Sequence, residues 1–175
     1  MLVITALVVL SQLYAAIPLL APVGAALGGS ATFALSTVYG LCYALGFLLW
    51  GPIADRYGRR RVMITGLVCL AATTFGCGLA SSLPLLAVLR GAQGLMASSL
   101  PPVGLAYLSE AVAPKRRATA IGAMSTAFLV AGIVGQVGAQ AVAEQLGWNW
   151  VFFGSTCLLV ACMLSIALLV RESDR

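Results

Sequence analysis

The chain has 175 residues, of which 61% are hydrophobic and only 9% are charged. An ordinary soluble domain carries about 25% charged residues, so this composition predicts that most of the chain lies in a membrane. The sequence contains no histidine, which excludes Ser-His nucleophiles and imidazole zinc sites. It also lacks a Gly-x-Ser-x-Gly motif and a phosphate-binding loop. We therefore expect no enzymatic activity, no metal and no cofactor.

The apolar residues fall into six runs, each long enough to cross a bilayer as a helix of about 20 residues. We predict an all-α integral membrane protein whose six helices form one bundle over residues 1–175. Pro101 and Pro102 predict a kink in the fourth helix. The expected spans are 2–21, 32–53, 62–82, 84–108, 118–141 and 150–170.

Basic residues cluster in the gaps that follow the second and fourth apolar runs. The first of these gaps, residues 55–61, contains four arginines, and the second contains Lys115, Arg116 and Arg117. The gaps after the first, third and fifth runs contain no Lys or Arg. Short loops rich in Lys and Arg stay in the cytoplasm, so we expect an inner-membrane protein with both termini in the cytoplasm. This pattern accounts for the net charge of +5 without a nucleic-acid partner.

The segment 51–61 joins the second and third runs by a tight turn. It reads Gly-Pro-Ile-Ala-Asp-Arg-Tyr-Gly-Arg-Arg-Arg. A guanidinium offers two parallel donors to a carboxylate, and such a pair at a helix junction can form a contact that breaks and re-forms. The spacing alone is equally compatible with a basic membrane anchor in which Asp55 is incidental.

Arg90 is the only charged residue deep within an apolar run. An Arg near the centre of a membrane helix costs roughly 2.5–3.5 kcal/mol, and such residues usually mark a function. Arg90 and Gly94 share a helix face with Gln93 beside them. We expect the guanidinium to point into the bundle, where backbone or Gln oxygens can solvate it. The alternative is a side chain that reaches up to the nearer membrane surface.

Both segments resemble signature elements of the major facilitator superfamily, a family of membrane transporters. The fourth run matches the family's Arg-x-x-Gln-Gly element at Arg90, Gln93 and Gly94. The tight turn matches the family's Gly-x-x-x-Asp-Arg-x-Gly-Arg-Arg loop, hereafter the signature loop, at Gly51, Asp55, Arg56, Gly58, Arg59 and Arg60. The resemblance implies that the six helices are two three-helix repeats of inverted topology, equivalent to the first half of a twelve-helix carrier.

The resemblance also implies a role for the signature loop. In the family, its Asp and Arg tie the two halves of the carrier together on the cytoplasmic side, and the tie breaks during alternating access. An acidic residue at the end of the fourth helix partners this loop, and Glu110 stands at that place. The alternative for Glu110 is a solvated helix end. The implied activity is transport of a small organic solute.

Amide and aromatic side chains suit amphipathic substrates, and residues four apart on a helix share a face. Isolated tyrosines serve equally well in packing. Two of the candidates adjoin a stripe of small residues, Ala131, Gly135 and Ala139, for which we favour helix packing over substrate contact. The candidates for lining a cavity are Gln12, Tyr14, Tyr39, Tyr43, Gln136 and Gln140.

The first run also resembles that of efflux-type members, through the Tyr14-to-Pro18 pattern. The fifth run keeps Gly135 of the element that drug-proton antiporters carry, but Gln136 stands where that element has proline. No Asp or Glu lies inside any run, although intramembrane carboxylates are the usual titratable groups of proton-coupled carriers. If efflux is driven by a proton gradient, the carboxylate comes from elsewhere or the coupling is indirect.

A six-helix half encloses only half a cavity. We therefore expect a second six-span bundle as partner, either another copy of the chain or a separately encoded half, together with a small organic solute and membrane lipid. The alternative is a truncated, non-transporting membrane remnant that at most modulates a related full-length carrier. The apolar run that begins directly after Met1 favours this alternative.

Overall fold

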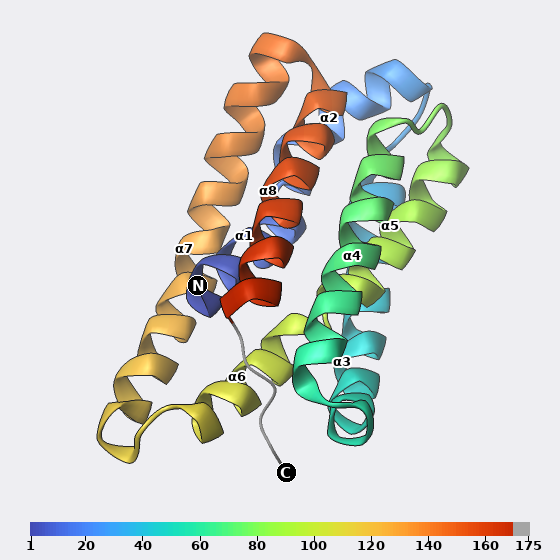
Figure 1. Cartoon of the computed structure of the whole chain (residues 1–175). Helices are drawn as coiled ribbons and strands as arrows, with labels where there is room; N and C mark the ends of the chain where they lie inside the picture. Colours follow the sequence, from blue (N-terminus) through green and yellow to red (C-terminus); the bar gives the residue numbers. More distant parts are fainter. Residues whose placement is uncertain (170–175) are drawn as a thin grey trace.

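The computed structural model describes residues 1–169, apart from the side chains at positions 110, 111 and 169. These residues form helices that lie side by side, without a β-strand (Figure 1). The prediction of an all-α protein is thus confirmed. The helices are α1 (Leu2–Tyr14), α2 (Ala16–Leu27), η1 (Phe33–Thr37), α3 (Val38–Tyr57), α4 (Arg59–Gly78), α5 (Leu83–Ala97), α6 (Leu100–Ala111), α7 (Pro114–Leu146) and α8 (Trp148–Leu169).

Several of these helices combine into membrane-spanning units. The π-helical turn η1 runs on into α3, and α5 and α6 together form another unit. Five units are long and apolar enough to cross a membrane on their own. The pair α1 and α2, which meet at 43°, provides a sixth when it is counted as one span. In the bundle α3 packs along α5, α4 along α8, and α1 along α7.

Proline explains two interruptions of the spans. Pro18 has no N–H to donate to the carbonyl of Tyr14, and its ring crowds that carbonyl, so the first span breaks at Ala15. Pro101 and Pro102 act in the same way on the fourth span. That span breaks at residues 98–99, directly before the two prolines. The structure thus contains the kink that the prolines predict.

The helices differ in length from the apolar runs. α7 has 33 residues, which corresponds to about 50 Å at 1.5 Å per residue and exceeds the roughly 30 Å of a hydrocarbon core. It extends beyond the expected 118–141 because Pro114 suits a helix start and the basic residues 115–117 continue the first turn. The connection between α3 and α4 is the single residue Gly58, whose φ of 93° favours glycine.

The stripe of small residues on α7 packs against α1. Ala131, Gly135 and Ala139 are all buried. A methyl group added to Gly135 would lie 2.6 Å from the backbone oxygen of Ser11, so only glycine permits the two helices to approach this closely. Gly138, on the same helix, has open space around it.

We predict that Gly135→Ala lowers the free energy of unfolding by about 1–3 kcal/mol, because the new methyl group forces α1 and α7 apart. Gly138→Ala is the matched control and should lie within about 1 kcal/mol of the wild type. Thermal unfolding of the two purified variants in detergent measures both effects. Equal stability of the two variants would contradict the close packing of α1 and α7.

Candidate functional site

The core of the bundle is organised around Arg90 on α5, whose side chain is 1% exposed. Its Nε and Nη2 donate to the carbonyl oxygen of Leu35 at 2.9 and 2.7 Å. Its Nη1 and Nη2 donate to the carbonyl oxygen of Gln12 at 3.3 and 3.4 Å. One guanidinium therefore joins the fourth span to the first and the second.

Both acceptors lie where their spans depart from the regular α-helix. Gln12 stands shortly before the break at Ala15, and Leu35 lies within the π-helical turn η1. Irregular backbone at membrane depth is tolerated only where other groups of the protein satisfy it or where it lines water. Arg90 donates the hydrogen bonds that these two carbonyl oxygens need, and the carbonyls in turn solvate the charge of the guanidinium.

Gln93 extends the contacts of Arg90 into a buried network, hereafter the Arg90 network. Its Oε1 accepts from Arg90 Nη1 at 2.7 Å, and its Nε2 donates to Thr74 Oγ1 at 2.8 Å. The Thr74 hydroxyl donates to the carbonyl of Leu70 at 2.6 Å. The network therefore reaches α4, so that four spans meet in one chain of hydrogen bonds.

Aromatic and glycine contacts complete the surroundings of Arg90. The guanidinium lies over the ring of Tyr39, 4.2 Å from its centroid, at a distance where the ring face attracts a cation. A methyl group added to Gly94 would overlap the backbone of Tyr39. Each residue of the Arg-x-x-Gln-Gly element thus has its own contact. Arg90 binds the first and second spans, and Gln93 connects Arg90 to α4. Gly94 allows α5 to approach α3 closely.

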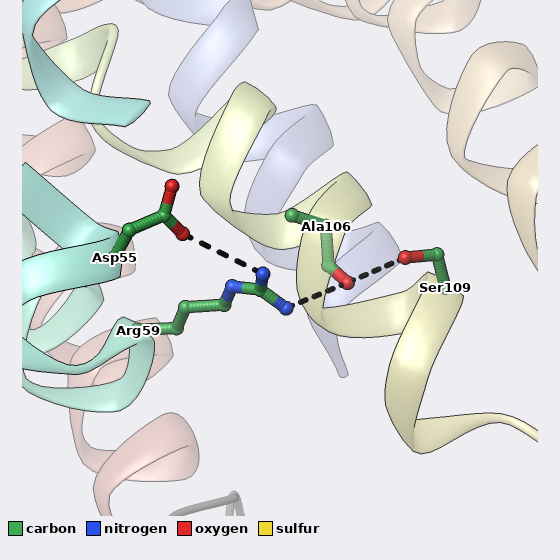
Figure 2. Close-up of polar contacts among 4 residues, drawn as sticks. All are labelled: Asp55, Arg59, Ala106 and Ser109. Atoms are coloured by element: carbon green, nitrogen blue, oxygen red, sulfur yellow. Dashed lines mark hydrogen bonds and ion pairs between the residues drawn. The ribbon is translucent and has the colours of Figure 1, made fainter. Parts of the chain in front are cut away.

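The signature loop forms a second polar cluster, at the lower end of the bundle in Figure 1. Figure 2 shows Arg59 between Asp55 and α6: its Nη2 lies 3.6 Å from Asp55 Oδ1, and its Nη1 donates to the Ala106 carbonyl at 3.0 Å. The Ser109 hydroxyl donates to the same carbonyl at 2.7 Å. Arg60 Nη2 donates to the Ala167 carbonyl of α8 at 2.6 Å. The loop thus ties α3 and α4 to α6 and α8.

Two residues of the signature loop, Arg56 and Gly51, make none of these contacts. Arg56 is exposed and lies 5.5 Å over the ring of Tyr57. Gly51 has open space around it. The side chain of Glu110 lies outside the described residues. The side chain of Asp55 is 70% exposed, and an ion pair so close to water contributes at most about 1 kcal/mol, so it breaks easily.

The residues expected to line a cavity separate into two groups. Gln12 and Tyr39 are buried: Tyr39 lies beneath Arg90, and the Gln12 amide donates to Val8 O at 3.2 Å. Tyr43 is half-buried and stacks on Tyr39, with ring centroids 6.1 Å apart.

The remaining three candidates for lining a cavity are less buried. Tyr14 and Gln136 are half-buried. The ring of Tyr14 comes within 3.8 Å of the position that a methyl group on Gly132 would take, so it packs along α7. Gln140 is exposed and lines an open pocket.

The sequence indicated Gln93 and Asp55 as partners of arginines, but it did not identify which backbone oxygens accept hydrogen bonds in the two clusters. Leu35, Ala106 and Ala167 contribute backbone oxygens, which every residue type carries, so no sequence signal marks them. Thr74 was not identified either, because Thr residues are common in apolar runs. The irregular backbone near Gln12 was not predicted, although Pro18 is a residue type that could have signalled it.

These features define the class of protein: a helical membrane protein in which a buried charge network and a charged loop tie several spans together. The family model of the Major Facilitator Superfamily matches residues 2–175, and the chain therefore belongs to this family, whose members are transporters rather than enzymes. The protein is accordingly an integral membrane protein.

Curated relatives include an uncharacterized MFS-type transporter of Mycobacterium tuberculosis, 32% identical over 78% of this chain and 24% of that protein. The multidrug export protein EmrB of Escherichia coli is 29% identical over 73% of this chain and 25% of that protein. A probable actinorhodin transporter of Streptomyces coelicolor is 29% identical over 86% and 27% of the two chains. The chain thus spans about a quarter of the length of these relatives.

A solved structure shares the fold. It is a bacterial homologue of the human lysosomal transporter Spinster, crystallised in an inward-facing and occupied conformation. The TM-score is 0.90, with 22% sequence identity over 99% of this chain and 44% of that one.

We predict that Arg90→Lys lowers the free energy of unfolding by about 2–4 kcal/mol, since a single ammonium cannot reproduce the planar fork that reaches both carbonyls. Arg117→Lys, at an exposed position, is the matched control and should be nearly neutral. Unfolding of both variants in detergent checks this. A neutral effect of Arg90→Lys would show that charge alone, without the fork geometry, holds the three spans.

Proposed function

We propose that the chain forms the first half of a carrier that exports small organic solutes by alternating access. Membership of a transporter family, the export function named for the Escherichia coli relative and the transport function named for the Streptomyces coelicolor relative support this. The observation that carries the proposal is the position of Arg59, which joins Asp55 on one side and the α6 backbone on the other. A gate needs such a contact, strong enough to hold one state and weak enough to release it.

The fourth span supplies the moving part of this gate. α6 is separated from α5 by the break at residues 98–99, so it can swing without disturbing the Arg90 network. When α6 moves away, Arg59 loses the Ala106 carbonyl but keeps Asp55, four residues earlier in the chain. The ion pair thus holds the guanidinium ready for the return of α6.

The Arg90 network supplies the fixed part. Its hydrogen bonds are fully buried, and therefore stronger than the part-buried hydrogen bonds of the signature loop. α5 consequently remains attached to α1 and η1 while α6 moves. The two signature elements thus have different roles. The Arg-x-x-Gln-Gly element makes contacts that persist throughout transport, whereas the signature loop makes contacts that break and re-form.

The remaining features of the carrier follow from the charge pattern and the family design. All ten basic residues except Arg90 lie in the segments 56–61, 115–117 and 171–175, which we place on the cytoplasmic side of the inner membrane, with both termini. A second six-span bundle would complete the cavity, lipid would cover the outer faces, and an ion gradient would drive export. The six spans would form two inverted three-helix repeats.

We predict that Asp55→Asn slows export by up to about fivefold, the factor that corresponds to a loss of at most about 1 kcal/mol from the closed gate. Asn keeps the size of Asp but not the charge that holds Arg59. Ethidium efflux from cells of a pump-deficient strain that express the carrier measures this effect. Arg56→Gln is the matched control, because Arg56 is exposed and lies over the ring of Tyr57, and it should export as the wild type does.

Two results would contradict the assigned gate. The first is ethidium efflux at the wild-type rate in the Asp55→Asn variant, with equal amounts of protein in the membrane. The second is an equal loss of efflux in Arg56→Gln, which would indicate that the loop acts only through its total charge.

A further inference from the structure

A pocket of about 410 Å³ opens between α2 and α7. The C-terminal end of α7 lies at the end of the bundle opposite the signature loop (Figure 1). This volume lies within the range of small-molecule sites. Its walls are largely apolar, and its polar groups are an amide and a carboxylate. The pocket, hereafter the α2–α7 pocket, is lined by Pro18, Pro22, Gln140, Ala143 and Glu144.

Within residues 1–169, no Lys or Arg lies near the carboxylate of Glu144 in the sequence. No Lys or Arg occurs in residues 1–54, 62–89 or 118–169. Arg117, the nearest cation along α7, is about 40 Å away at 1.5 Å per residue, well beyond the roughly 8 Å over which salt screens charges. Arg90 is buried in its own network.

The helix itself adds to the negative potential. Glu144 lies two residues before the end of α7 at Leu146. The C-terminal end of a helix carries a partial negative charge from its unsatisfied carbonyls, which favours cations there and disfavours a carboxylate. A carboxylate at this position therefore works against helix stability, whereas its potential suits the binding of a cation.

Hydrogen bonding keeps the carboxylate at the pocket. Gln140 Nε2 donates to Glu144 Oε1 at 2.9 Å, and both residues line the cavity. The second carboxylate oxygen stays available to a ligand. Pro18 and Pro22, one turn apart on α2, provide rigid apolar surface opposite it. The pocket therefore offers one negative charge beside an apolar wall.

We propose that the α2–α7 pocket binds an organic cation with an apolar body, with Glu144 as its counter-charge. The apolar body would lie against the two prolines and Ala143, and the positive centre would lie beside the carboxylate. This proposal names a class of solute for the proposed carrier, and its physiological meaning rests on that function. Binding to the pocket itself requires no transport and is measured separately.

The test is equilibrium binding of tetraphenylphosphonium to the 175-residue chain in lipid nanodiscs made of neutral lipid. The wild type should bind the cation, and Glu144→Gln should bind it about tenfold more weakly, because the amide keeps the shape but loses the charge. Triphenylphosphine oxide, a neutral probe of related shape, should bind both proteins equally. Unchanged melting temperatures would establish that the variant is folded.

Two double variants keep the composition and net charge of the wild type. Glu144→Gln with Gln140→Glu moves the carboxylate one turn along α7 but leaves it in the pocket, and should restore binding to within about threefold. Glu144→Gln with Gln145→Glu moves the carboxylate to a residue that does not line the pocket, and should bind as weakly as Glu144→Gln.

Three results would overturn the proposal: no binding of tetraphenylphosphonium by the wild type, equal affinity of Glu144→Gln, or full restoration by the Gln145→Glu double variant. The last would indicate a diffuse surface attraction rather than a site. Binding with the predicted pattern but no export of solute would contradict only the proposed transport function. Export without such binding would contradict only the pocket.

Discussion

The buried charge of Arg90 is the constraint on which the rest of the bundle depends. A guanidinium in an apolar interior costs several kcal/mol unless its donors find acceptors. Here the acceptors are the backbone oxygens of Gln12 and Leu35 and the amide of Gln93. The first and second spans depart from regular helix beside these very carbonyls. The irregular backbone and the buried charge therefore stabilise each other, and both are needed to position the fourth span.

The two polar clusters differ in burial, and this difference gives them different mechanical properties. The Arg90 network is excluded from water, where hydrogen bonds to a charge are strong and their loss is costly. The contacts of Arg59 lie near the surface, with Asp55 largely exposed, and can be exchanged for water at little cost. The break before Pro101 separates the part of the fourth span that belongs to each cluster. A single span thus combines a fixed half, α5, with a half that can move, α6.

Much of this arrangement was predictable from the sequence, because apolar runs and charge positions are set by the membrane. The helical class and the kinks near Pro18 and Pro101 follow from residue type. The π-helical turn around Leu35 was not predictable, since it depends on a guanidinium that comes from a helix 55 residues later in the chain. The position of Tyr39 beneath the Arg90 guanidinium was not predictable for the same reason. Glu144 was not predicted as a binding residue, because in the sequence a carboxylate near a helix end indicates only a solvated side chain. The pocket beside it becomes apparent only in the structure.

Hydrogen–deuterium exchange of the wild type and Arg90→Met in nanodiscs tests the central role of Arg90 most directly. Met fills a similar volume but donates no hydrogen bond. The amides of residues 13–17 and 35–39, beside the two carbonyl acceptors, should exchange faster in the variant, while those of α8, which the guanidinium does not contact, should stay as protected as in the wild type. Unchanged exchange at both segments would contradict the account, as would an equal increase along all spans.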